Sequence, residues 1–158
     1  MSDAVSGRNA SELTGHIETQ FHARHRRQLP PLLRLADMIE DLHVGDAGVP
    51  EGLFGILRRM TEDLEVQKKT EELILFPAIR RAGDLQLENE IEKLRAANED
   101  LKRNAAEIRR ITNGLTLPQG ACEPWETLYS GLTEFVADLE EHMRLENDVL
   151  FPRDVDAD

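Results

Sequence analysis

The sequence predicts an all-α protein, folded as an antiparallel up-down-up-down four-helix bundle. Of its 158 residues, 40% are hydrophobic and 32% charged but only 4% aromatic, which suits amphipathic helices better than sheets. Four long segments with helical periodicity are separated by short turns rich in breaker residues. In three of these segments, inward positions recur in alternating steps of three and four residues, the spacing that keeps one seam facing a bundle core.

The first helix is expected over residues 9–43, before a glycine-rich turn. Asn9 could start it by pairing with Glu12 in a capping box. Pro30 and Pro31 should kink it midway, because proline lacks the backbone N–H that the helix needs.

The other helices follow from their start and stop signals. The second is expected over 50–83, with Pro50 in its first turn. The third covers 84–112, and Asn113-Gly114 supplies a left-handed terminator. The fourth follows Pro124 and ends at 151–152. We therefore expect one bundle domain over 9–153, a disordered segment at 1–8 and an acidic tail at 154–158.

Charge and composition exclude several functions. A net charge of −12 would repel a phosphate backbone, so no nucleic acid partner is expected. Membrane contact is not expected either, since no stretch approaches the roughly 20 apolar residues of a span, and the polar start suggests a cytoplasmic protein. Cys122 is the single cysteine, so any metal must be held by His, Glu or Asp. No nucleophile-base or nucleotide-binding motif is visible, and we expect no conventional catalytic activity.

The predicted seam contains polar residues that need partners when buried. It runs through Leu53, Leu57, Met60, Leu64, Gln67, Glu71 and Ile74, then Leu87, Ile91, Leu94, Asn98, Leu101, Ala105 and Ile108, and finally Leu128, Leu132, Phe135, Leu139, His142, Glu146 and Val149. The five polar positions fall at corresponding places in the three helices.

An internal repeat relates these polar positions. DLEVQKKTEELILFP at 63–77 matches DLEEHMRLENDVLFP at 138–152, so that Gln67 precedes His142 by 75 residues and Glu71 precedes Glu146 by 75. His22 precedes Asn98 by 76. In bundles with paired helices, a His-x-x-x-Glu turn from each pair and a further ligand from each remaining helix can hold two metal ions. Here two of the four histidine positions carry amides.

The residues also resemble a known family, the hemerythrin-like (HHE cation-binding) di-iron proteins, and most closely the C-terminal domain of iron-sulfur cluster repair (RIC) proteins. The resemblance rests on six motifs: HARHRRQLP at 22–30, PEGL at 50–53, EELILFP at 71–77, ACEPW at 121–125, LYSGL at 128–132 and HMRLENDVLFPR at 142–153. It implies a left-handed bundle with a non-heme di-iron centre, four terminal histidines and two bridging glutamates. Carried over by position, the terminal ligands would be His22 and His142, the bridging ones Glu71 and Glu146, and the degenerate positions Gln67 and Asn98.

Three functions remain open at this stage. The leading one is a metal-binding protein with a degenerate, possibly mononuclear site at His22, Glu71, His142 and Glu146, related to the response to nitric oxide or oxidative stress and to iron-sulfur centre repair. Its metal would be iron, as one or two ions, with Mn or Zn as alternatives, and its small ligand nitric oxide or dioxygen. The second is a metal-free scaffold or regulatory partner whose amides close a hydrogen-bonded network. The third is a complete two-metal site in which other groups, such as Glu99 or water, replace the missing histidines.

The remaining histidines and the cysteine have plainer interpretations. His16 and His25 are expected on the surface, and His43 in a structural role, roughly 30 Å from His22 along the helix. Cys122 is expected to be an inert packed thiol, although a helix start can favour a thiolate. The sequence predicts neither a protein partner nor an oligomeric state.

Overall fold

The computed structural model describes residues 8–81 and 88–150. Several predicted features lie outside the described residues: the helix limits at 83–84 and 151–152, the seam residue Leu87, the side chain of Val149 and the acidic tail 154–158. Residues 1–7 of the expected disordered segment also lie outside them. Arg8, its last residue, already belongs to the first helix.

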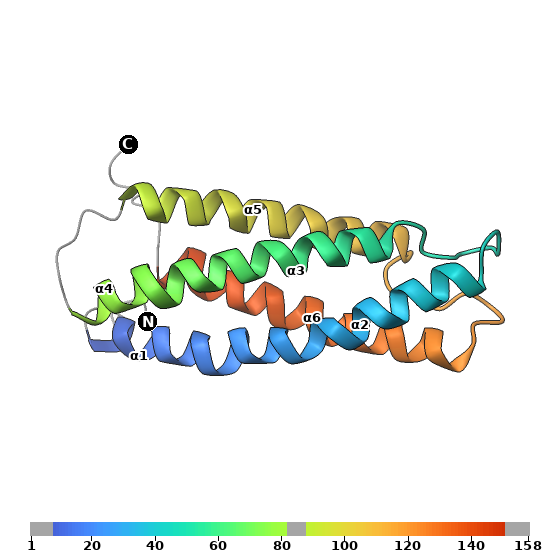
Figure 1. Cartoon of the computed structure of the whole chain (residues 1–158), viewed down its shortest axis with the longest axis horizontal. Coiled ribbons are helices and arrows are strands. Elements are labelled where there is room, and N and C mark those ends of the chain that lie inside the picture. Colours follow the sequence, from blue (N-terminus) through green and yellow to red (C-terminus); the bar gives the residue numbers. More distant parts are fainter. Residues whose placement is uncertain (1–7, 82–87, 151–158) are drawn as a thin grey trace.

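The described residues form four long helices, three of which contain a π-helical turn (Figure 1). In chain order they are α1 (Arg8–His16), η2 (Ile17–His22) and α2 (Ala23–Leu42); α3 (Leu53–Thr70), η3 (Glu71–Leu75) and α4 (Phe76–Arg80); α5 (Glu88–Ile111); and α6 (Glu123–Arg144) with η4 (Leu145–Leu150). The helix α2 packs against α3 and α6, and α5 packs against the same two. This closed arrangement confirms the predicted bundle, and the described part of the chain contains no strand.

Two predicted helix starts are wrong by a few residues. Asn9 lies inside α1 rather than capping it. The second helix starts at Leu53 instead of Pro50, because Gly52 adopts a left-handed backbone (φ 90°) that only glycine accepts readily. The carboxylate of Glu40 then accepts hydrogen bonds from the backbone N–H groups of Gly52 and Phe54, at 2.9 and 2.7 Å. A side chain of the preceding helix thus takes the place of a local cap.

Two other predictions are confirmed, namely the bend at the prolines and the left-handed end of the third helix. Pro30 and Pro31 lie inside α2, and the ribbon changes direction within that helix (Figure 1). After α5, Asn113 (φ 52°) and Gly114 (φ 70°) are both left-handed, and the N–H of Gly114 donates to the carbonyl of Arg109 at 2.7 Å. These bonds end the third helix as expected.

The π-helical turns move the inward seam by one residue. Ile74, predicted in the seam, is 52% exposed, whereas Leu75 is fully buried. A π-helical turn contains about one residue more than an α-helical turn, because its hydrogen bonds span five residues instead of four. In η3 the buried face therefore continues from Glu71 to Leu75, four positions on, and the prediction of Ile74 is wrong.

Polar seam residues separate two hydrophobic clusters. The larger cluster includes Leu64, Leu101 and Leu139, and the smaller one comprises Ile17, Phe21, Leu75, Phe76 and Leu94. Along the second and third helices, Gln67, Glu71 and Asn98 lie in sequence between members of the two clusters, and all three are buried. The polar layer is consequently enclosed by apolar side chains at both ends.

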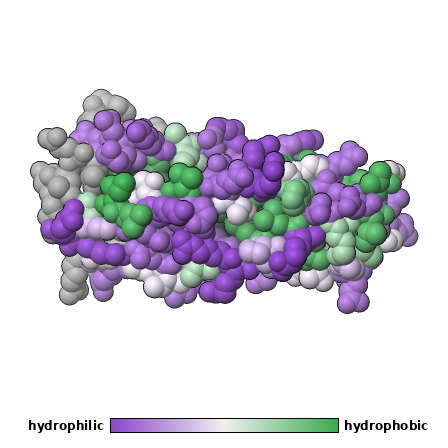
Figure 2. Space-filling model, viewed as in Figure 1, coloured by the Kyte–Doolittle hydropathy of each residue, from purple (hydrophilic) through white to green (hydrophobic). Residues whose placement is uncertain are grey.

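The outer surface is mainly hydrophilic on the face that Figure 2 shows, with hydrophobic residues gathered in separate patches. Leu73 and Ile74, displaced outward with η3, are among the exposed apolar residues. Among the described residues, no helix combines the length and apolar character that crossing a membrane requires.

Candidate metal centre

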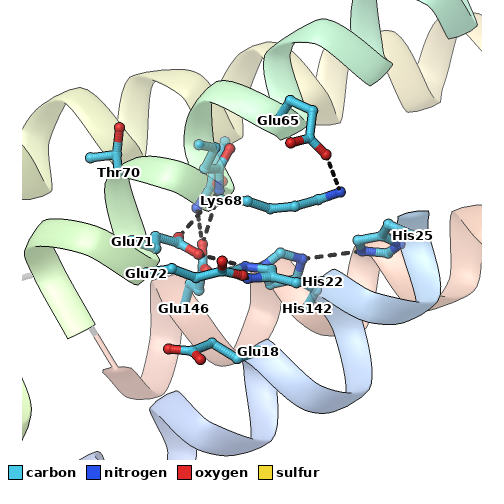
Figure 3. Close-up of polar contacts among 12 residues, drawn as sticks. Glu18, His22, His25, Glu65, Lys68, Thr70, Glu71, Glu72, His142 and Glu146 are labelled. Carbon is cyan, nitrogen blue, oxygen red and sulfur yellow. Dashed lines mark hydrogen bonds and ion pairs between the residues drawn. The ribbon is translucent and has the colours of Figure 1, made fainter. Parts of the chain in front are cut away.

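The structure brings together the four residues predicted to bind metal. His22 comes from η2, Glu71 from η3, His142 from α6 and Glu146 from η4 (Figure 3). Each offers one nitrogen or oxygen, and these four atoms all lie within 4.8 Å of one another. All four side chains are at most 1% exposed.

On one side of the cluster, His22 is held between two carboxylates. Its Nδ1 lies 2.7 Å from Oε2 of Glu72, and its Nε2 lies 2.8 Å from Oε1 of Glu71. An ionised Glu72 can only accept, so the imidazole proton belongs on Nδ1. The lone pair of His22 Nε2 then faces Glu71.

On the other side, a chain of hydrogen bonds sets the orientation of His142. Asp138 Oδ2 accepts from Gln28 Nε2 at 2.8 Å, which leaves Gln28 Oε1 to accept from His25 Nδ1 at 3.3 Å. His25 Nε2 is then the acceptor for His142 Nδ1, 3.2 Å away. His142 Nε2, on the opposite side of the ring, lies 2.8 Å from Glu146 Oε2.

The two amides occupy the remaining side of the carboxylates. Gln67 Nε2 lies 2.7 Å from Asn98 Oδ1, 3.2 Å from Glu146 Oε1 and 3.4 Å from Glu71 Oε2. Asn98 Nδ2 donates to Glu146 Oε1 at 3.1 Å and to Asn147 Oδ1 at 3.2 Å. Each glutamate thus directs one oxygen to a histidine and the other to an amide N–H. The outer oxygens of both glutamates are therefore occupied by hydrogen-bond donors.

The protonation states follow from burial and from the neighbouring charges. Burial, with a smaller contribution from His142, lowers the pKa of His22 to about 3, so this imidazole is neutral at physiological pH. Burial and the nearby charge of Glu146 raise the pKa of Glu71 well above its usual range. Burial alone would also raise the pKa of Glu146, but His142 and hydrogen bonds, including one from Asn98, lower it to about 2. Glu71 therefore favours its protonated form beside the ionised Glu146, because two buried carboxylates repel each other.

These residues fit a bound cation. Neutral imidazoles and carboxylates are the protonation states that ligate metals, and a positive ion would relieve the repulsion that raises the pKa of Glu71. The Nε2 atoms of His22 and His142 both point to the two carboxylates, so all four groups converge. The second nitrogen of each imidazole already has a hydrogen-bond partner, as is usual for histidines that bind metal.

Sequence reasoning missed three residues around the cluster. His25 is fully buried beside His142, so its expected surface position is wrong. Its spacing of three from His22, which puts both on one helix face, was the available signal. Glu72 contacts His22, and Lys68, only 2% exposed, pairs with Glu65 at 3.2 Å (Figure 3). Nothing in the local pattern distinguished these two from surface charges.

The other candidate residues lie apart from the cluster. His16 is exposed, as predicted. Glu99 pairs with Lys102 at 3.5 Å and its side chain is 56% exposed, so it does not complete a second metal position. His43 is bonded to Asp46 and to Cys122 at the far end of α2.

Residues 15–153 match the sequence model of a known family, the hemerythrin HHE cation binding domain. The chain belongs to this family. The match therefore begins within α1, reaches into all four helices and includes every residue of the candidate centre.

Curated relatives of this hemerythrin-like protein carry a common name, iron-sulfur cluster repair protein YtfE. The one from Pectobacterium atrosepticum is 38% identical over 154 residues, which are 96% of this chain and 70% of the relative. Those from Dickeya chrysanthemi and Edwardsiella ictaluri are 40% and 39% identical over 142 residues, 90% of this chain and 64% of each relative. The chain thus spans about two thirds of the length of these relatives.

Proposed function

We propose that this hemerythrin-like protein binds one non-heme metal ion, with iron as the best-suited metal, through His22, Glu71, His142 and Glu146. It would act in the cytoplasm, in the response to nitric oxide or oxidative stress and in the repair of iron-sulfur centres. The names of the relatives and the family's cation-binding description support this proposal. They favour it over a metal-free scaffold.

One observation carries the proposed stoichiometry. Gln67 and Asn98 direct N–H groups at the outer oxygens of Glu71 and Glu146. An N–H group repels a cation, and amide oxygens are weaker ligands for iron than imidazoles. The inner oxygens face the two histidines, which are the donors that an ion would share with them. The donor set of two imidazoles and two carboxylates suits Fe(II), with Mn(II) or Zn(II) as alternatives.

The chain's own side chains would prepare the site before any ligand arrives. Glu72 and His25 contact the Nδ1 atoms of His22 and His142. The Nε2 atom of each imidazole is thereby directed to the position of the ion, which it would ligate. The rings of Phe76 and Phe21, both buried, stack on His22 and His142 respectively. When bound, the ion would supply an open coordination position for a small diatomic ligand, nitric oxide or dioxygen.

Elemental analysis tests the proposal directly. Protein purified without a metal-affinity tag is measured before and after anaerobic Fe(II) reconstitution, as metal per chain. A value near one is expected for the unaltered protein and near zero for Glu71→Gln, whereas Glu62→Gln, an exposed residue of α3, should leave it unchanged. A value near zero for the unaltered protein in both samples would overturn the proposal in favour of the metal-free scaffold, and near two would overturn the single-ion stoichiometry.

The ligand and the repair activity need separate measurements. Nitric oxide added anaerobically to the iron-loaded protein should change its visible absorption, and Glu71→Gln should abolish the change. For repair, an iron-sulfur enzyme inactivated by nitric oxide is incubated with the protein, and its recovery is followed. Recovery with the unaltered protein but not with Glu71→Gln supports the repair proposal, and equal recovery with both would contradict it.

A further inference from the structure

A thiol, an imidazole and a carboxylate meet at the opposite end of α2 from the metal centre. His43 is the C-cap residue of α2, Asp46 lies in the turn that follows, and Cys122 is the N-cap residue of α6. His43 and Cys122 are 79 residues apart in the sequence. None of the three residues contributes to the cluster around His22 and His142.

The three groups are arranged in the order nucleophile, base and orienting acid. Cys122 Sγ lies 3.3 Å from His43 Nε2, and His43 Nδ1 lies 2.8 Å from Asp46 Oδ2. Asp46 accepts the Nδ1 proton, so the lone pair of Nε2 is free to take the proton of the thiol. The ring of Trp125 packs against that of His43, with centroids 4.7 Å apart, and holds the imidazole in place. This is the geometry of an activated nucleophile.

The surroundings favour the charged form of the thiol. Burial alone would raise the pKa of Cys122, but hydrogen bonds from His43 and from the backbone of Trp125 lower it below its usual range. Hydrogen bonds to Cys122 and then to Asp46 raise the pKa of His43. Both shifts favour a thiolate beside an imidazolium, and Cys122 also lies at the positive N-terminus of a long helix.

Small molecules can reach the thiol from solvent. Cys122 and His43 are partly exposed, and the side chain of Asp46 is 58% exposed. The thiol lies where two segments of the chain meet, residues 43–52 and 112–126. These segments contain no Lys or Arg but four acids, namely Asp46, Glu51, Glu123 and Glu126. This charge disfavours anionic reactants.

We propose that Cys122 is a reactive thiol that forms a mixed disulfide with neutral or cationic low-molecular-weight disulfides, assisted by His43 and Asp46. The thiol proton passes to His43 Nε2 while Sγ bonds to one sulfur of the disulfide and the S–S bond breaks. The departing sulfur takes the proton from His43. One thiol and one disulfide thus give one mixed disulfide and one thiol, with no external oxidant. This site is independent of the proposed metal function.

The metal-loaded 158-residue chain is incubated with bis(2-hydroxyethyl) disulfide, and the adduct is followed by mass spectrometry. Because Cys122 is the only cysteine, the adduct can form nowhere else. At pH 6 the native chain should react roughly fivefold or more faster than the urea-unfolded chain, the gain in thiolate outweighing the lower nucleophilicity of a low-pKa thiol. Trp125, the only tryptophan, reports the adduct through its fluorescence.

Variants separate an activated thiol from an inert one. His43→Gln should remove most of the native advantage and Asp46→Asn part of it, whereas His16→Gln, an exposed histidine of α1, should leave the rate unchanged. A native rate no higher than the unfolded one, or one unaffected by His43→Gln, would overturn the proposal. Far-UV circular dichroism establishes that each variant is folded.

Two measurements need no substitution near the thiol. The thiolate absorbance of the unaltered protein, corrected with Cys122→Ser, should titrate at a lower pH than that of the unfolded chain, and an equal or higher midpoint would refute an activated thiol. Cystamine, a cationic disulfide, should react several-fold faster than oxidised glutathione, which is anionic, relative to their rates with the unfolded chain. Equal relative rates would contradict the charge selectivity.

Discussion

Gln67 Nε2 lies 2.7 Å from Asn98 Oδ1, and this amide pair occupies the side of the carboxylate cluster that faces away from His22 and His142. The two amides also donate to Glu71 and Glu146. They satisfy the outer carboxylate oxygens by hydrogen bonds. The proposed single-ion stoichiometry rests on this relationship.

Restoring both histidines should restore the second metal position. In the variant Gln67→His with Asn98→His, we expect iron per chain after anaerobic reconstitution to rise from near one to near two, because imidazole donors replace N–H groups that repel a cation. Elemental analysis checks this result. The single variant Gln67→His is the matched control and should stay below two, and an unchanged value for the double variant would contradict the assignment.

Glu72 should control metal affinity without being a ligand. Its contact of 2.7 Å with Nδ1 of His22 fixes the imidazole, and loss of such a partner typically weakens metal binding about 10–100-fold. Glu72→Gln should therefore raise the Fe(II) dissociation constant by about this factor, measured by competition with a chelator. An unchanged dissociation constant would show that Glu72 is dispensable, and exposed Glu62→Gln provides the control.

The π-helical register predicts opposite results for adjacent residues. Leu75→Ala removes a fully buried side chain and should lower the free energy of unfolding by about 2–5 kcal/mol. Ile74→Ala alters a side chain that is 52% exposed, and its effect should remain within about 0.5 kcal/mol. Urea unfolding checks both. A regular α-helix through η3 would reverse the order of the two effects.

Acid should destabilise the metal-free protein over a defined range. Burial lowers the pKa values of His22 and His25 from 6.5 to about 3, so between these values the unfolded chain binds protons that the native chain does not. Stability is therefore lost as pH falls through this window, by about 1.4 kcal/mol per pH unit for each proton. Urea midpoints of chelator-treated protein at several pH values measure the slope.

His25→Gln should reduce the slope of the unfolding free energy against pH by the contribution of one proton, about 1.4 kcal/mol per pH unit. His16→Gln should leave the slope unchanged. A slope unchanged in His25→Gln would contradict the assignment to this residue. Glu71 contributes with the opposite sign: its raised pKa means that the native chain keeps a proton which the unfolded chain loses, so its contribution is lost as pH rises through the raised value.

Much of the fold could be predicted from the sequence, because it depends on local signals. The three-and-four periodicity, Asn113-Gly114 after the third helix and Pro124 at the start of the fourth correctly located the elements of the bundle. The helix starts were less certain, since Gly52 and the distant Glu40 together determine where α3 begins. Ile74 was misplaced because a π-helical turn leaves no clear signal in the hydrophobic pattern.

The candidate metal centre, too, could be predicted from the sequence only in part. The repeat offset between Glu71 and Glu146, together with the resemblance to a known family, was sufficient to select four residues that the fold brings within 4.8 Å. Their role as ligands remains a prediction. His25 and Glu72 were missed because their contacts with His142 and His22 come from other helices, and no local pattern encodes them.

By itself the sequence determined the helices, their order and the donor types in the polar layer, since periodicity and turn chemistry act over only a few residues. Only the tertiary structure decided which histidine nitrogens face which carboxylates and which carboxylate oxygens accept from Gln67 and Asn98. It also decided that Cys122 contacts His43, 79 residues away in the sequence. These relationships depend on how the helices pack and rotate against each other. A shift of one residue in a helix turns a side chain by about 100° and changes its partner.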